Sequence, residues 1–247
     1  MKHHASPQRA YRMDARPRES ELAFQVVVEE TDLWITAQKD LSPEVHSAVH
    51  RLRGMVKNAL ALYADFGPSL RPVPVPDSAP ALIREMAEAA LAWNVGPMAC
   101  VAGAIAQGVA DSCQPHSPEL LVENGGDLYL HSTRERTIGL LAQPDQGLRL
   151  GLRLNATDFP CALCASSGRI GHSLSLGSGD LVVVRARQGA FADAGATALA
   201  NLLHRRQDVQ RVLDQAKEMA AQGLQGVFAQ YDDQIGVWGQ MELVEVG

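Results

Sequence analysis

An almost wholly apolar stretch, residues 190–203, carries a polar side chain at every fourth position: Asp193, Thr197 and Asn201. On a helix this spacing places the three side chains in one stripe. A carboxylate buried alone among apolar groups is strongly destabilising, so something must compensate Asp193. One explanation is a hard cation such as Mg²⁺, held by the Asp193 carboxylate and the Thr197 hydroxyl and completed by phosphate oxygens. The other is a structural aspartate that is capped or paired with an arginine.

A second stretch, residues 123–127, reads Glu-Asn-Gly-Gly-Asp between two strand patterns. Gly125 and Gly126 allow a sharp turn or a close approach of the backbone to a ligand. An ordinary hairpin turn explains the same residues, because Asn-Gly and Gly-Gly both favour it.

A third stretch, residues 161–173, combines hydroxyl groups, glycines and His172. The Ser166-Ser167-Gly168 run could offer hydroxyl and main-chain N–H groups to a phosphate. His172 is a candidate acid or base, since its charge changes near neutral pH; the alternative is a hydrogen-bonded structural histidine. Cys161 and Cys164 form a CxxC pair with no second pair beside it, so we expect buried, reduced cysteines and neither a zinc site nor a disulfide.

The elements that must position these residues follow in blocks of strands and helices. A hairpin is expected at 22–29 and 31–38, and a helix opens at Pro43 and stops near Pro68. Because strands and helices do not alternate strictly, we predict an α+β fold with mixed or antiparallel sheets packed against helices. Further helices are expected at 79–93, 98–111, 190–204 and 207–220, and further strands at 119–123, 127–131, 137–143, 148–154, 180–187, 225–231 and 236–246.

Four short motifs occur in a characteristic order: Gly103-Ala-Ile-Ala-Gln-Gly108, the Gly125–Asp127 turn, the Ser166–Gly168 turn, and Ala192-Asp-Ala-Gly-Ala-Thr197. This order resembles the ApbE-like superfamily, the FAD-dependent FMN transferases. The strings VGPMA, ENGGD, SSGxxGHS and ADAxAT are similar to an uncharacterised branch of that superfamily, over most of the chain.

The resemblance implies an ApbE-like fold and a role for each motif. It implies that Asp193 and Thr197 bind Mg²⁺ together with the backbone carbonyl of Ala106. It also implies that the two turns approach the diphosphate and ribityl parts of FAD. The residues expected there are Gly125, Gly126, Asp127, Ser166, Ser167 and Gly168.

The chain also departs from the transferases. Gln107 stands where they carry a lysine, His172 follows Gly168 after only three residues, and no D-P-x-T-G string follows. Two functions therefore stay open. One is a magnesium-dependent flavin or nucleotide-diphosphate enzyme that cleaves FAD or transfers FMN to a protein acceptor, with His172 as its proton-transfer group. The alternative is a non-catalytic protein that binds a phosphorylated or anionic metabolite on the same fold.

Composition limits the class of protein further. The chain has 247 residues, 46% hydrophobic residues and a formal net charge of -6. A mildly acidic chain is a poor nucleic-acid binder, and no apolar run is long enough to span a membrane. We expect a polar, flexible lead-in over residues 1–20 without a signal peptide, one ApbE-like domain over 21–247, and cytoplasmic residence. A small phosphorylated ligand and self-association into a homo-oligomer are the expected partners.

Overall fold

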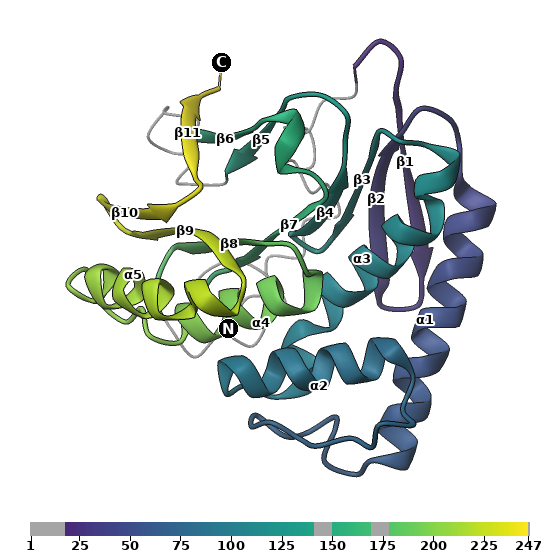
Figure 1. The fold of residues 1–247 in the computed structure, drawn as a ribbon, viewed down its shortest axis with the longest axis horizontal. Coiled ribbons are helices and arrows are strands. Elements are labelled where there is room, and N and C mark those ends of the chain that lie inside the picture. The colour runs from purple at the N-terminus through teal and green to yellow at the C-terminus, as the bar shows by residue number, and fades with distance from the viewer. Residues whose placement is uncertain (1–17, 141–149, 169–177, 247) are drawn as a thin grey trace.

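The computed structural model describes residues 18–140, 150–168 and 178–246. Eight of its strands form one antiparallel sheet, in the order β1-β2-β3-β4-β7-β8-β9-β10 (Figure 1). Three more strands form a small antiparallel sheet in the order β11-β6-β5. The large sheet contains β1 (Leu22–Val28), β2 (Thr31–Ala37), β3 (Leu120–Asn124), β4 (Asp127–His131), β7 (Cys161–Ser166), β8 (Leu181–Ala186), β9 (Leu224–Tyr231) and β10 (Gln234–Gly239), and the small one β5 (Arg136–Leu140), β6 (Leu150–Leu154) and β11 (Glu242–Glu245).

Five α-helices are found in the described part of the chain. Helices α1, α3, α4 and α5 pack against one face of the large sheet, and α2 packs on the outer side of the other helices (Figure 1). They are α1 (Ser42–Leu62), α2 (Ala81–Trp93), α3 (Val101–Cys113), α4 (Gly189–Ala200) and α5 (Asp208–Met219), with short 3₁₀ turns at Pro97–Cys100, Gln114–His116, Ala156–Asp158 and Ala220–Gln222. Among the described residues no single helix is long and apolar enough to cross a membrane; only α2 counted together with Pro97–His116, bent by 106°, meets that length and composition.

Two hydrophobic cores follow from this arrangement of layers. The larger core lies between the helices and the sheet, and the smaller one lies between the opposite face of that sheet and the three-stranded sheet. Cys164 belongs to the first core and Cys161 to the second, because residues three apart on a strand point to opposite faces. All four cysteines are free and buried, as the sequence predicted, and the CxxC pair cannot share one ligand.

The α+β fold with antiparallel sheets is confirmed, but several expected elements were wrong in detail. Helix α1 ends at Leu62 and not near Pro68, because Tyr63 takes an extended conformation. Residues 161–166 form strand β7, which we had treated as part of a ligand-binding stretch because its Ala, Cys and Ser residues carry no strand pattern. Helix α4 ends at Ala200 and not at 204, because the next amides make turn bonds: Leu202 donates to the Leu199 carbonyl and Leu203 to the Ala200 carbonyl. The last predicted strand is two strands, since Gly239 adopts a φ of 78° and the chain passes from the large sheet to the small one.

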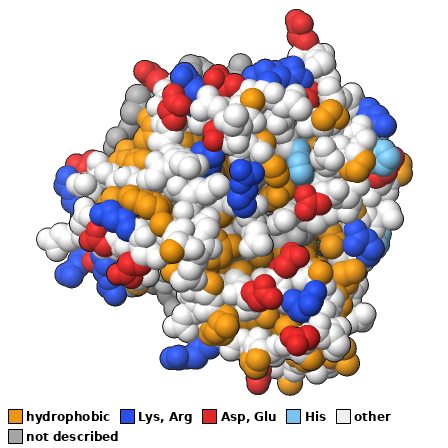
Figure 2. Space-filling view, viewed as in Figure 1, with side chains coloured by type: hydrophobic (Ala, Val, Ile, Leu, Met, Phe, Trp, Pro, Cys, Tyr) orange, Lys and Arg blue, Asp and Glu red, His pale blue; other side chains and the backbone are white. Residues whose placement is uncertain are grey.

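Surface charge is distributed without a dominant sign on the face shown in Figure 2. Acidic and basic side chains alternate there, with small groups of hydrophobic side chains between them (Figure 2). This distribution agrees with the modest net charge of -6.

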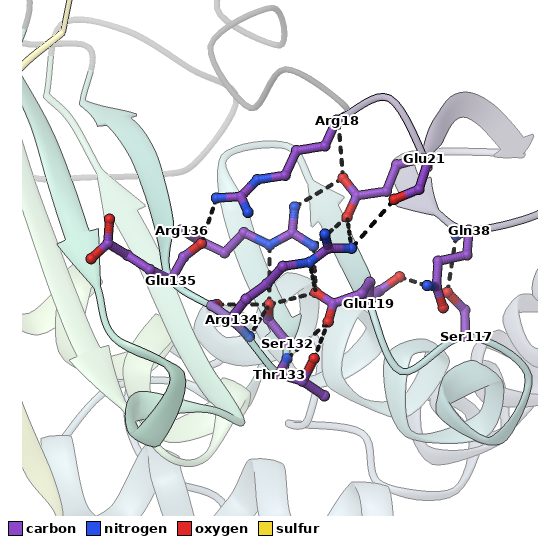
Figure 3. A network of polar contacts seen from close by, with 11 residues as sticks. Arg18, Glu21, Gln38, Ser117, Glu119, Ser132, Thr133, Arg134, Glu135 and Arg136 are labelled. Carbon is purple, nitrogen blue, oxygen red and sulfur yellow. Dashed lines mark hydrogen bonds and ion pairs between the residues drawn. The ribbon is translucent and has the colours of Figure 1, made fainter.

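A buried ionic network joins the start of β1 to the small sheet (Figure 3). Arg136 lies between two carboxylates: its guanidinium donates to Glu21 and, at 2.6 Å, to Glu119. These three side chains are 5% exposed or less. Burial alone would raise the pKa of Glu119, but hydrogen bonds from Ser132, Thr133 and Arg136 outweigh it and lower the pKa to about 2. The network therefore fixes the first described residues to the body of the fold.

Helices α3 and α4 touch through their backbones. A Cβ atom on Gly103 would lie 2.4 Å from the Gly189 carbonyl oxygen and 2.8 Å from the Cβ of Asp193. A Cβ on Gly189 would likewise lie 2.2 Å from the Gly103 oxygen. Only glycine fits at both positions, and this contact sets the position of Asp193 relative to α3.

Replacing Glu119 by Gln should destabilise the fold by about 3 kcal/mol, because a buried guanidinium loses one of its two carboxylates. The pKa of Glu119 is lowered on folding from 4.5 to about 2, so its contribution is present above pH 4.5 and is lost as the pH falls toward 2. Urea unfolding at several pH values should show this slope in the wild type and a smaller one in E119Q. As a control, Glu242→Gln removes an exposed pair with Arg153 and should change stability by about 0.5 kcal/mol or less. Equal effects of the two substitutions would contradict the assignment.

Replacing Gly103 by Ala should destabilise the protein by about 1–3 kcal/mol, because the new methyl group forces α3 and α4 apart. Gly54 provides the matched control: it lies inside α1, and a Cβ there would meet nothing within 4 Å. Gly54→Ala should therefore be neutral or stabilise by up to about 1 kcal/mol. Denaturant unfolding compares the two, and a harmless Gly103→Ala would show that the helices can separate freely.

Candidate ligand and cation site

Asp193 lies on α4 with its carboxylate directed at the start of α3. Its Oδ2 accepts a hydrogen bond from the Gly103 amide at 2.8 Å, and the Ala102 amide also donates to this carboxylate. These N–H groups belong to the first turn of α3, which has no partner for them within its own helix. The amino end of α3 thus caps a carboxylate that is only 7% exposed.

A second carboxylate reaches the same place from the sheet. Asp127 opens β4, is 7% exposed, and accepts a hydrogen bond from the Ala165 amide of β7 at 3.2 Å. Burial raises its pKa to about 7, with a smaller rise from the charge of Glu123, although the Ala165 amide and the Cys164 thiol oppose the rise. Burial and the charge of Asp127 raise the pKa of Asp193 well above its usual value.

The structural alternative of an arginine pair is not found among the described residues, where no basic side chain forms an ion pair with Asp193. The capped alternative is found, because the Gly103 and Ala102 amides donate to the carboxylate. Capping does not remove the repulsion between two buried carboxylates, which can both stay ionised only beside a cation. Burial and like charge therefore make this pair a place where a bound proton or a metal ion is favoured.

The described residues contain no group of three or more His, Cys, Asp or Glu side chains arranged to hold a metal. A cation beside Asp193 would therefore need hydroxyl, carbonyl, water or ligand oxygens as well. Thr197 lies one turn further along α4, and its residue is 5% exposed. Such a site would offer few protein ligands, and all of them would be oxygen atoms. Mg²⁺ accepts this kind of site more readily than zinc, which prefers nitrogen and sulfur ligands.

The Gly125-Gly126 turn connects β3 to β4, with Asn124 paired to Asp127. Gly125 has φ 69° and Gly126 has φ 114°, so both need the left-handed region that favours glycine. Among the described residues, a Cβ at either position would meet nothing within 4 Å, so none of them closes off the turn. The hairpin explanation is thus correct, and it leaves the turn accessible to a ligand.

The Ser166–Gly168 turn lies at the same end of the sheet as this hairpin. Strand β7 pairs with β4 through Leu163 and Leu128, and the antiparallel register brings the end of β7 to the start of β4. Within the described part of the chain, the Ser166 hydroxyl is buried and has no hydrogen-bond partner. Ser167 is half-buried, and Gly168 is exposed with its amide already bonded to the Gly179 carbonyl at 3.1 Å.

The remaining predicted residues divide between the helices and the undescribed segments. Ala106 is fully buried inside α3. Gln107 accepts a hydrogen bond from the Gly189 amide at 2.7 Å, so it caps the first turn of α4 and is not directed at a ligand phosphate. His172 lies outside the described residues.

Sequence reasoning missed two groups at this site. Asn124 donates from its Nδ2 to the Ala102 carbonyl at 3.1 Å and so joins the hairpin to the start of α3. The Cys164 thiol lies beside Asp127 and donates to the Gly189 carbonyl at 3.7 Å. An Asn in an Asn-Gly-Gly run predicts only a turn, and Cys164 is flanked by apolar residues. The neighbouring sequence therefore did not indicate which group either residue would contact.

Comparisons with known proteins identify the family of this chain. The model of the family described as "AbpE bacteria" matches residues 14–243. A UPF0280 protein of Methanopyrus kandleri is 34% identical over 224 residues, which cover 88% of this chain and 90% of the relative. One from Methanocaldococcus jannaschii is 37% identical over 199 residues, 78% of each chain.

Two solved structures share the fold at low sequence identity. The apo flavinyl transferase ApbE of Pseudomonas stutzeri superposes with a TM-score of 0.54 at 14% identity, over 92% of this chain and 94% of that one. The flavin transferase ApbE of Vibrio cholerae gives 0.51 at 15% identity, over 88% and 96%. Because the family model spans nearly the whole chain, the protein belongs to this bacterial branch of the ApbE-like family.

Proposed function

We propose that this protein binds a flavin dinucleotide through a magnesium-bridged diphosphate and cleaves it at the diphosphate. One observation carries the proposal: Asp127 and Asp193, from two separate motifs, are both 7% exposed, the charge of Asp127 raises the pKa of Asp193, and neither carboxylate has a basic partner among the described residues. A magnesium ion would remove their repulsion and would bring a phosphate-bearing ligand with it. The flavin transferases that share the fold support the choice of a flavin ligand.

The residues present fit such a cation. Asp193 and Thr197 would hold it from one face of α4, with Asp127 as the second carboxylate and the Ala106 carbonyl as a further oxygen. This assigns Asp127 to the cation rather than to the diphosphate itself, because a carboxylate repels phosphate. When bound, the ion would supply positive charge to the phosphate oxygens during bond cleavage.

The two turns would orient the ligand. The buried Ser166 hydroxyl lacks a partner within the described part of the chain, so a ligand oxygen at this position would satisfy it. The open Gly125-Gly126 turn would let a large ligand approach the backbone. The Gly168 amide is already bonded to the Gly179 carbonyl, so it would not donate to the ligand. Its lack of a side chain would instead leave room for the ligand.

The reaction that fits is cleavage of the diphosphate P–O bond of FAD with AMP as the leaving group. The FMN phosphoryl group would pass to water, giving free FMN, or to a threonine hydroxyl of an acceptor protein, giving a phosphoester and releasing the hydroxyl proton. His172 remains the proposed acceptor of that proton.

A second candidate function is binding without cleavage, and Gln107 favours it. The transferases that the chain resembles carry a lysine at this position, whereas Gln107 bonds the Gly189 amide and lies 3.4 Å from Asp111. A site without that positive charge stabilises a leaving phosphate less. The two functions differ in whether FAD is consumed.

Incubation with FAD and Mg²⁺ should yield FMN and AMP, measured by chromatography. Asp193→Asn should reduce the rate by about 100-fold or more, because one ligand of the cation is lost. Asp214→Asn, which removes an exposed pair with Lys217, serves as the control and should leave the rate unchanged. Thermal stabilisation by FAD and Mg²⁺ without any FMN would establish binding only, and absence of both effects would exclude both functions.

The pair of carboxylates should also make stability depend on pH and Mg²⁺ together. Folding raises the pKa of Asp127 to about 7, so without a cation the contribution of this group falls as the pH rises from 4 through 7. Mg²⁺ competes with the proton, so it should raise the unfolding temperature more at pH 8 than at pH 6. Asp127→Asn should weaken both dependences. A Mg²⁺ effect equal at the two pH values would contradict the assignment.

A further inference from the structure

Two histidines of α1 lie one helical turn apart on its exposed side. His46 and His50 are both exposed, and their rings stack with centroids 6.0 Å apart and an interplanar angle of 24°. The buried side of α1, which includes Val45, Val49 and Leu52, packs on the main core and leaves this stripe to solvent. The geometry is fixed by a helix of 21 residues.

We propose that His46 and His50 form an accessory site for a late first-row divalent metal, such as Zn²⁺, Ni²⁺ or Cu²⁺. Imidazole nitrogens are ligands that these metals prefer, at about 2.0–2.1 Å for zinc. Residues at i and i+4 on a helix lie close enough for both to reach one ion. Exposed histidines can rotate about their side-chain bonds, so the rings can tilt from their stacked arrangement toward a shared metal.

The surroundings of the pair permit a cation. Two arginines follow the pair on α1. The Arg51 guanidinium is directed away to the Ser112 hydroxyl on α3, at 2.9 Å, and Arg53 is held by Glu29 and Glu30 at 2.5 Å each, so the charge of Arg53 is balanced. Gly54, the next position of the stripe, leaves open space where water can complete the coordination.

This site is separate from the carboxylate pair in position and in chemistry. Helix α1 lies at the outer edge of the helical layer, whereas Asp193 lies on α4 beside the amino end of α3 (Figure 1). Two nitrogen ligands select against Mg²⁺, which prefers oxygen. The accessory site therefore does not depend on the proposed flavin function.

Calorimetric titration of the full chain with ZnCl₂ tests the proposal. The wild type should bind one equivalent at this pair, and His46→Ala and His50→Ala should each weaken that binding by about 10-fold or more, because one of two ligands is lost. Cu²⁺ should bind more tightly than Zn²⁺. MgCl₂ should give no signal that these substitutions change.

Two control variants isolate the pair from other ligands. A His3→Ala/His4→Ala variant keeps the α1 pair and should still bind one equivalent of Zn²⁺. Asp193→Asn should also still bind it. Zn²⁺ should raise the unfolding temperature of the wild type, since the two ligands meet only when α1 is folded, and should raise it less in His50→Ala. Identical zinc isotherms for the wild type, His46→Ala and His50→Ala would overturn the proposal.

Discussion

The repulsion between two buried carboxylates is the constraint around which this end of the molecule is built. Asp127 comes from the sheet and Asp193 from α4, and each is 7% exposed. Within the described part of the chain the compensation comes from hydrogen-bond donors: the Gly103 and Ala102 amides for Asp193, and the Ala165 amide and the Cys164 thiol for Asp127. Hydrogen-bond donors do not neutralise two charges, so the pair is stabilised further by a proton on one carboxylate or, in the proposed function, by a magnesium ion.

Contacts in the rest of the fold hold those two carboxylates in place. The contact of Gly103 with Gly189 allows α3 to point its first turn at Asp193, and it excludes any larger residue. Asn124 joins the hairpin to the same turn of α3, and Gln107 joins α3 to the start of α4. Hydrogen bonds or backbone contacts therefore connect the hairpin, α3 and α4 close to the site. These contacts, rather than the helix or strand propensity of each segment, set the positions of the two carboxylates.

Much of this could be predicted from sequence, and the missing part has a physical reason. The polar stripe of α4 was visible because an aspartate is conspicuous among apolar residues, and the Gly-Gly turn because its residues favour positive φ. The approach of Asp127 to Asp193 was not visible, since it depends on the register of β4 with β7 and on how α4 crosses the sheet. Strand β7 was missed for a related reason: both of its faces are buried, so it lacks the alternation that marks a half-exposed strand.

The position of Gln107 bears on charge balance at the site. In the transferases that this chain resembles, a lysine at this position adds a positive charge near the ligand. Here Gln107 is neutral and is used to cap α4, so the described part of the site contains two carboxylates and no basic side chain to offset them. An anionic diphosphate could enter such a place only together with a cation, because otherwise it would add negative charge to negative charge. In the proposed function, the neutral Gln107 therefore leaves the metal to balance the charge of the diphosphate, whether or not cleavage follows.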